Sequence, residues 1–169
     1  MVTASLVLGE DGSTTLAGTS RGISTPEDRE VFLSRRRDAD CIIVGGRTAT
    51  FEPYTKTPVP LIIVSRSRPL AIDINAQAHW WNVSPVEAVT KARKEFGKNI
   101  AIEGGANFIH NLLAAGCIDE LRLSITPITG GEDKIMIHEL TKFFAKISEE
   151  EKMGVTHFFT CTKPITNPK

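Results

Sequence analysis

The sequence has 169 residues, of which 41% are hydrophobic and 24% are charged, and its formal net charge is zero. This length suits one domain with a buried core, and the neutral balance gives no indication of nucleic acid or an acidic membrane surface as a partner. No apolar run is long enough to span a bilayer, and residues 1–5 lack the basic start of a signal peptide, so we expect a cytoplasmic protein.

The cysteines are three in number, Cys41, Cys117 and Cys161, and two of them lie in apolar surroundings typical of strands or turns. An odd count in such surroundings favours reduced, buried thiols over a disulfide framework. No histidine forms a pair with another histidine or a cysteine at the helical spacing of a metal site. We therefore expect no metal.

The N-terminal part of the chain predicts a strand, a turn and a polar loop. Residues 2–8 are typical of a strand, the Asp-Gly pair at Asp11 is a turn signal, and residues 13–16 suit a return strand. Small polar residues follow in 18–24, among them Ser20. They either offer hydroxyl and N–H groups to a ligand or simply form a loop.

The first predicted helix begins at Thr25, which suits the N-cap position, with Pro26 in the first turn and two acids after it. It should run to about Arg36. Residues 35–37 are three arginines at its end. They either complement the helix dipole in solvent or offer a planar guanidinium fork to a phosphate.

Two continuous apolar runs, residues 41–44 and 61–64, predict strands that are covered on both faces. Gly45 and Gly46 follow the first run directly, and Thr48 comes next but one. A glycine pair after a buried strand that leads to a hydroxyl forms either a plain turn or a loop that holds a phosphate or a nicotinamide.

The next segment predicts a strand over 78–83 and a helix after it. The adjacent Trp80 and Trp81 should point to opposite faces of the strand, so one of them is expected to be exposed. Ser84 begins a capping box with proline in the first turn, and this helix should run to Phe96.

Residues 98–130 carry the pattern around which the chain is organised. A short strand ends at Glu103, and Gly104 and Gly105 then allow a sharp turn and the close approach of a ligand. A helix over 106–115 follows, and its free N-terminal N–H groups favour a phosphate. The alternation over 121–125 predicts a half-buried strand. A lone glycine pair of this kind is more often a tight turn without a ligand.

The C-terminal part predicts closing strands over 143–147 and 155–162, and residues 164–169 form a loose tail. Residues 1–163 therefore make up one domain. The order of strands and helices predicts an α/β fold, with a mostly parallel central sheet flanked by helices and an antiparallel C-terminal strand pair.

The sequence pattern around the second glycine pair is longer than the pair itself. The run Glu103-Gly104-Gly105, the segment 111–113, the segment 116–121 and Pro127 together resemble the dihydrofolate-reductase-like superfamily. The closer match is to the pyrimidine reductases of riboflavin biosynthesis, which are usually fused to a deaminase domain. Two positions depart from that pattern: Gly22 stands where the family usually has a tryptophan, and Glu52 is the one acid where the family has an acidic pair.

The resemblance implies an NADPH-dependent reductase that acts as 5-amino-6-(5-phosphoribosylamino)uracil reductase does, with hydride reducing the ribosyl group to ribityl. The apolar closing strands and the paired tryptophans, together with the resemblance, predict a homodimer, and the charge balance predicts no nucleic-acid or membrane partner. A superfamily reductase acting on a pterin or another small heterocycle, and a non-catalytic NADPH-binding dimer, are the alternatives. The roles that it implies are catalysis by Glu103 and Glu52, substrate binding by Ser20, Arg36, Asp11 and Glu103, and cofactor binding by Thr48, Gly45, Gly46, Gly104, Gly105, Ala106, Asn107 and Phe108.

Glu103 carries the sharpest of these expectations. A carboxylate one residue before a phosphate-binding turn is unfavourable unless it faces the substrate, where it accepts hydrogen bonds. On this interpretation Glu103→Gln leaves folding and NADPH affinity nearly intact and lowers catalytic efficiency.

Overall fold

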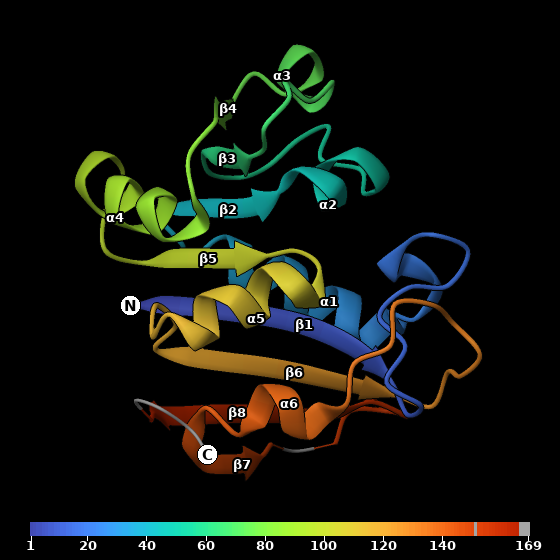
Figure 1. Cartoon of the computed structure of the whole chain (residues 1–169). Coiled ribbons are helices and arrows are strands. Elements are labelled where there is room, and N and C mark those ends of the chain that lie inside the picture. Colours follow the sequence, from blue (N-terminus) through green and yellow to red (C-terminus); the bar gives the residue numbers. More distant parts are fainter. Residues whose placement is uncertain (151, 166–169) are drawn as a thin grey trace.

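The computed structural model describes residues 1–150 and 152–165, and one sheet of eight strands forms its centre (Figure 1). Along the sheet the strands follow the order β4-β3-β2-β5-β1-β6-β8-β7. Their bounds are β1 Val2–Gly9, β2 Cys41–Gly45, β3 Leu61–Val64, β4 Ala78–Trp81, β5 Ile100–Glu103, β6 Glu120–Thr126, β7 Phe144–Glu149 and β8 His157–Pro164.

The strands from β4 to β6 in this order are parallel, β8 pairs antiparallel with β6, and β7 pairs antiparallel with β8. Strand β5 lies between β2 and β1, although it follows both of them in the chain. The chain therefore returns to the middle of the sheet before it continues to β6. The predicted α/β class, with a mostly parallel sheet and an antiparallel C-terminal pair, is confirmed.

The helices cover both faces of the sheet, with α4, α5 and α6 on one face and α1 on the other (Figure 1). Their bounds are α1 Pro26–Arg36, α2 Gly46–Phe51, α3 Ala71–Ile74, α4 Pro85–Glu95, α5 Ala106–Ala114 and α6 Ile137–Thr141, with a 3-10 turn η1 at Ser20–Gly22.

Burial on both faces explains the continuous apolar runs in the sequence. In β2, Cys41 and Ile43 belong to the core beneath α4 and α5, whereas Ile42 and Val44 belong to a second cluster on the opposite face. Neither face of this strand reaches solvent, so no polar alternation is needed.

Helix α1 differs from the helices on the other face in what it buries. Its buried residues are Asp28 and Arg36, both charged, whereas α5 buries Ile109, Leu112 and Leu113 among others. Buried charges need partners. The space under α1 is therefore polar rather than a packed apolar layer.

The predicted helix starts are confirmed by their capping bonds. The backbone N–H of Asp28 donates to Thr25 Oγ1 over 3.2 Å. At α4 the capping box is complete, since Glu87 N donates to Ser84 Oγ and Ser84 N donates to the Glu87 carboxylate. Both caps fix where the chain leaves a loop and enters a helix.

Several local predictions need correction. Residues 13–16 do not form a return strand, because Thr15 and Leu16 make only isolated bridges, to Glu132 and Thr19. Helices α2, α3 and α6, of six, four and five residues, were not predicted, because so short a helix shows no repeated apolar stripe. The strand over 78–83 ends earlier, at Trp81.

The tryptophan prediction is confirmed, and two of the three cysteines, Cys41 and Cys161, are buried as predicted, whereas Cys117 is partly exposed. Trp80 is 38% exposed and Trp81 is 8% exposed, as expected of neighbours on opposite faces of a strand. All three cysteines are free. Burial raises the pKa of the Cys41 thiol to about 12 and that of Cys161 to about 11, so both thiols stay protonated at neutral pH.

The C-terminal end differs slightly from the predicted tail. Pro164 is the last residue of β8, and Ile165 N donates to Phe143 O over 2.8 Å. Residues 166–169 of the predicted tail lie outside the described residues. Among the described residues no helix has the length and apolar character that crossing a membrane requires.

Candidate functional site

A cavity of about 980 Å³ opens where the parallel strands β1, β2 and β5 reach their carboxyl ends. In open α/β sheets this edge is where ligands bind, next to the point where the strand order reverses. The lining includes every predicted site residue except Asp11, namely Ser20, Arg36, Gly45, Gly46, Thr48, Glu52, Glu103, Gly104, Gly105, Ala106, Asn107 and Phe108.

Two glycine turns form one wall of this cavity and are tied to each other. The backbone N–H of Gly105, which caps α5, donates to Thr48 Oγ1 in α2 over 2.9 Å. Gly104 has a φ of +141°, a conformation that side chains disfavour. A Cβ on Gly46 would lie 2.6 Å from Ser65 Cβ, so this position also requires glycine.

These turns fit an anionic ligand. Gly105 is exposed, and Ala106 and Asn107, which follow it in the first turn of the nine-residue helix α5, also line the cavity. The first N–H groups of a helix together with the helix dipole favour a phosphate. The glycine pairs predicted from the sequence thus meet in one place, although they are 59 residues apart in the chain.

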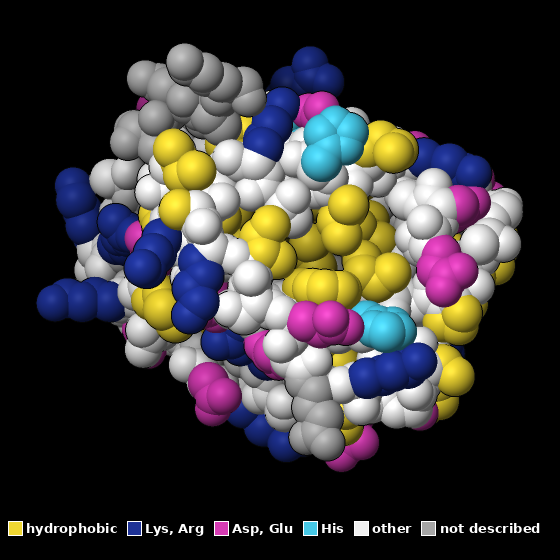
Figure 2. Space-filling view, turned by 90° about the horizontal axis from the view of Figure 1, so that it is seen from below, with side chains coloured by type: hydrophobic (Ala, Val, Ile, Leu, Met, Phe, Trp, Pro, Cys, Tyr) yellow, Lys and Arg dark blue, Asp and Glu magenta, His cyan; other side chains and the backbone are white. Residues whose placement is uncertain are grey.

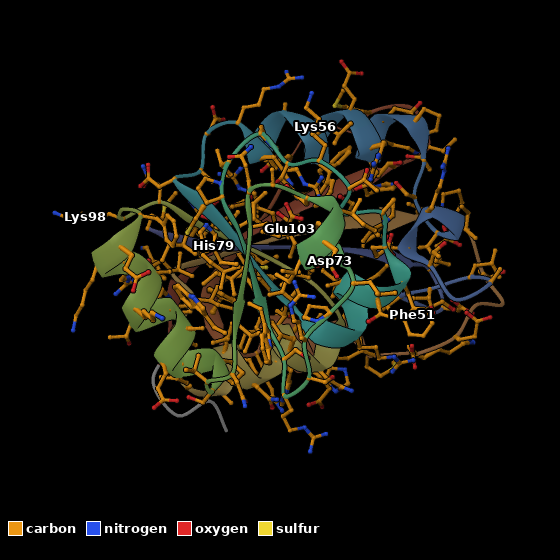
Figure 3. The ribbon with its side chains drawn as sticks, turned by 90° about the horizontal axis from the view of Figure 1, so that it is seen from above. Phe51, Lys56, Asp73, His79, Lys98 and Glu103 are labelled. Atoms are coloured by element: carbon orange, nitrogen blue, oxygen red, sulfur yellow. The ribbon has the colours of Figure 1, made fainter. Side chains whose placement is uncertain are left out.

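A buried ion pair also lines the cavity. Arg36 Nε donates to Glu103 Oε1 over 2.8 Å, and Arg36 Nη2 donates to Glu103 Oε2 over 2.6 Å. The hydroxyl of Tyr54 donates to Glu103 Oε2 over 3.0 Å. Figure 3 places Glu103 among the interior side chains, whereas Lys98 lies at the surface. Because Glu103 is 3% exposed, this pair is largely shielded from water.

Aromatic rings and charge together stabilise the guanidinium in this pair. The Phe32 ring centroid lies 4.6 Å from Arg36 Cζ and the Tyr54 centroid lies 5.2 Å from it. Burial opposes the charge on Arg36, but the hydrogen bonds and attraction of Glu103 raise its pKa. Burial and then the Glu103 carboxylate raise the pKa of Tyr54 well above its ordinary value, so its phenol stays protonated.

This geometry changes what is expected of Glu103. Both carboxylate oxygens already accept hydrogen bonds from Arg36 and Tyr54, so the carboxylate is not the free acceptor that the sequence suggested. Removing one partner of a buried ion pair destabilises a fold. This arrangement argues against the expectation that Glu103→Gln leaves folding intact, and we predict a loss of stability instead.

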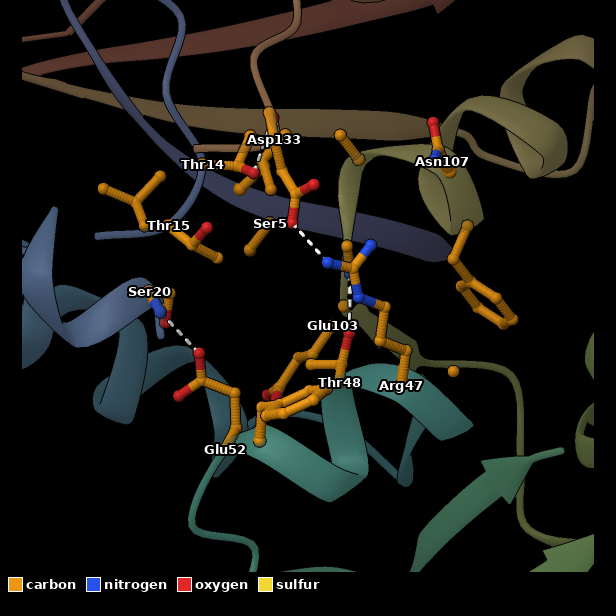
Figure 4. Close-up of a pocket in the computed structure, with 18 of the residues that line it drawn as sticks. Ser5, Thr14, Thr15, Ser20, Arg47, Thr48, Glu52, Glu103, Asn107 and Asp133 are labelled. Carbon is orange, nitrogen blue, oxygen red and sulfur yellow. Dashed lines mark hydrogen bonds and ion pairs between the residues drawn. The ribbon is translucent and has the colours of Figure 1, made fainter. Parts of the chain in front are cut away.

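Ser20 and Glu52 contact each other directly, as Figure 4 shows. The backbone N–H of Ser20, in η1, donates to Glu52 Oε1 over 2.6 Å. Glu52 is the residue that ends α2. This bond joins the polar loop near the N-terminus to the C-terminal end of α2, and both residues line the cavity.

Asp11 is the predicted site residue that the fold does not bring to the cavity. Its carboxylate accepts hydrogen bonds from Ser13 N and Oγ, from Gly130 N and from Lys134 Nζ, the last over 2.7 Å. The bond from the Lys134 ammonium, with those from Ser13 and Gly130, holds the pKa of Asp11 well below its usual range. Asp11 thus fixes the loop after β6, and its geometry gives no support to a substrate role.

Sequence reasoning missed three functional candidates. Tyr54 carries no motif that marks it, because its partner Glu103 is 49 residues away in the chain. Asp133 lies in a loop recognised only by its glycines, and its carboxylate accepts a hydrogen bond from Arg47 over 2.8 Å across the cavity (Figure 4). Phe32 has a helical spacing of four residues to Arg36, the one signal that could have identified it. In the described part of the chain, no group of three His, Cys, Asp or Glu side chains is arranged to hold a metal.

The sequence is similar to known proteins. A model of the RibD C-terminal domain matches residues 1–155. The uncharacterized protein YyaP of Bacillus subtilis (strain 168) is 42% identical over 62 residues, which cover 37% of this chain and 33% of that protein. The match thus spans about a third of that relative's length.

Solved structures share the fold at low identity. A pyrimidine reductase-like protein from Corynebacterium diphtheriae has a TM-score of 0.73 at 20% identity, with 98% of this chain and 92% of that chain covered. Acinetobacter baumannii RibD has a TM-score of 0.68 at 14% identity, and the match covers 98% of this chain and 58% of that chain. A diaminohydroxyphosphoribosylaminopyrimidine deaminase/5-amino-6-(5-phosphoribosylamino)uracil reductase from Thermotoga maritima has a TM-score of 0.67 at 12% identity. That match covers 98% of this chain and 56% of that chain. The fold is the dihydrofolate-reductase-like one that the sequence predicted.

Proposed function

Because the chain belongs to the RibD C-terminal domain family, we propose that it is a reductase that uses NADPH to reduce the ribosyl group of a ribosylamino-pyrimidine to a ribityl chain. The single observation that carries the proposal is the pair of glycine turns, tied by the bond from Gly105 N to Thr48 Oγ1 at the mouth of the cavity. When bound, the nicotinamide would supply the hydride. The protein's own contribution is placement and charge.

The cofactor side of the cavity is formed by groups that suit a dinucleotide phosphate. Gly46 and Gly104 keep side chains out of the turns, and the N-terminus of α5 presents backbone N–H groups. Arg47 and Arg66 add positive charge to the same wall. The residues that we propose for the cofactor are Gly45, Gly46, Thr48, Gly104, Gly105, Ala106, Asn107 and Phe108.

The substrate side lies under α1. Glu103 occupies Nε and Nη2 of Arg36, which leaves Nη1 for a ligand oxygen. We assign Glu103 the role of a positioning residue that holds this guanidinium. Glu52 is the carboxylate that handles a proton or accepts from the substrate, because its Oε1 is fixed by Ser20 N and its Oε2 is left for a second donor. Ser20 lines the same part of the cavity.

One observation favours the alternative of a pterin or another heterocycle as substrate. A Cβ on Gly22 would lie 2.6 Å from Leu16 O and 2.7 Å from Leu16 Cβ. This backbone therefore has no room for the tryptophan that the resembled reductases carry at this position, so that side chain cannot close the cavity here.

The test is NADPH oxidation, followed by absorbance, with a ribosylamino-pyrimidine, its phosphate ester and a dihydropterin as acceptors. Turnover of a ribosylamino-pyrimidine with formation of the ribityl product supports the proposal. Turnover of the pterin alone favours the second candidate. NADPH binding without turnover of any acceptor would favour a non-catalytic NADPH-binding dimer.

We also propose that the protein is a homodimer and cytoplasmic. Large apolar side chains are exposed on its C-terminal part, and Figure 2 shows hydrophobic side chains gathered on the face seen from below. A second copy would remove this area from water. The exposed residues are Met136, Ile137, Ile147, Met153, Val155 and Ile165. The free thiols and the use of a reduced nicotinamide suit the cytoplasm.

We expect light scattering at micromolar concentration to give twice the chain mass of 18.5 kDa. The variant Ile147→Asp, which places a charge on the exposed edge strand β7, should shift the mass to that of one chain. Leu70→Asp is the matched control, because Leu70 is also exposed but lies beside α3, at the other end of the sheet. A single-chain mass for the unmodified protein would reject the dimer.

A further inference from the structure

An ion pair crosses the cavity between its two walls. Arg47 lies in the first turn of α2, and Asp133 lies in the loop between β6 and α6. Arg47 Nη2 donates to Asp133 Oδ2 over 2.8 Å, and both residues line the cavity (Figure 4). Their side chains are 71% and 45% exposed, so solvent and ligands can reach the pair.

The loop holds Asp133 in a fixed position. Its backbone has a φ of +50°, and its carbonyl accepts a hydrogen bond from Thr14 Oγ1 over 2.8 Å. The neighbouring Glu132 accepts from Thr15 Oγ1, and Lys134 is bound to Asp11. The Asp133 carboxylate is therefore presented by an anchored loop, and the long side chain of Arg47 reaches it from α2.

Because of where Arg47 lies, its contact with Asp133 opposes the binding of an anionic ligand. Arg47 follows Gly46 on the wall that carries the glycine turns, and Arg66 lines the same cavity. A phosphate bound there would attract the Arg47 guanidinium and be repelled by Asp133. The ligand must therefore separate the ion pair or bind beside an acid.

We propose that Asp133 competes with the phosphate of the bound nucleotide for the Arg47 guanidinium. By holding Arg47 in the absence of ligand, Asp133 sets the affinity of the site. The identity of the nucleotide as NADPH rests on the proposed function; the competition itself requires only a phosphate-bearing ligand. Exposed ion pairs change an equilibrium by at most about fivefold, which limits the size of the effect.

The experiment measures the dissociation constants of NADPH and of inorganic pyrophosphate by calorimetry at low and high salt. We expect Asp133→Asn to bind both ligands about three- to fivefold more tightly at low salt, and the gain should shrink at high salt because the pair is exposed. In an Arg47→Gln background, Asp133→Asn should change either constant by less than about twofold. Glu132→Gln is the matched control: it removes the adjacent charge, which contacts Thr15 rather than Arg47, and should give a smaller gain.

Unchanged or weaker pyrophosphate binding by Asp133→Asn overturns the inference, as does a gain that persists without Arg47. Failure of pyrophosphate to bind any variant overturns it as well. If NADPH does not bind but Asp133→Asn tightens pyrophosphate, the proposed cofactor is wrong and the competition stands. Thermal unfolding of each variant confirms that the differences arise in folded protein.

Discussion

Glu103→Gln should lower the free energy of unfolding by about 3–5 kcal/mol, because it leaves the Arg36 guanidinium buried without its counter-ion. For a domain of this size that change lowers the melting temperature by roughly 6–20 °C. The side chains of Arg36 and Glu103 are 9% and 4% exposed, so water can replace little of the lost interaction. Thermal and urea unfolding provide the measurement.

A double-mutant cycle separates the ion pair from the rest of the site. Arg36→Met with Glu103→Leu removes both charges, and we expect the double variant to be more stable than either single variant, since no unpaired charge stays buried. Tyr54→Phe is the milder control, because it removes one neutral donor to Glu103 and should cost about 0.5–1.5 kcal/mol. Glu103→Gln with the stability of the unmodified protein would contradict the structural role.

Gly104→Ala should weaken NADPH binding at least tenfold, or about 1.4 kcal/mol, while the protein still folds. A Cβ at this position would make only ordinary contacts, the nearest at 3.4 Å from Gly45 N and Thr48 Oγ1. The cost arises from the φ of +141°, which an alanine reaches only with strain of about 1–3 kcal/mol. Relief of that strain moves Gly105 N away from Thr48 and displaces the start of α5.

Gly116→Ala is the matched control for this prediction. Gly116 also has a positive φ, of +64°, but it follows the far end of α5 and no heavy atom lies within 4 Å of an added Cβ. We expect a loss of stability of about 1 kcal/mol and an NADPH dissociation constant within about twofold of the unmodified protein. Equal NADPH affinity in Gly104→Ala and Gly116→Ala would contradict the role of the turn.

The elements that the sequence predicted well are those whose signals are local. The continuous apolar runs of β2 and β3 and the caps at Thr25 and Ser84 depend on residues within a few positions of each other. The two glycine turns are recognisable for the same reason. The parallel sheet then brings the turns together, because the carboxyl ends of neighbouring parallel strands share one edge.

The parts that escaped prediction depend on contacts between distant residues. Arg36 and Glu103 are 67 positions apart, and no pattern along the chain indicates that one neutralises the other. The resemblance gives Asp11 a substrate role, but its carboxylate is taken by Gly130 and Lys134, more than a hundred positions later. Local pattern and the family resemblance therefore identified the residues of the candidate site, whereas the pairing of charges inside it required the fold.

Titration of the protein with NADPH and with NADH tests the central claim most directly. The claim predicts that NADPH binds with one site per chain and more tightly than NADH, because the glycine turns and Arg47 and Arg66 line the wall where its additional phosphate is expected to lie. Binding should be measured by calorimetry at fixed low salt, with Gly104→Ala as the weakened reference. Failure of the unmodified protein to bind either nucleotide would contradict the account.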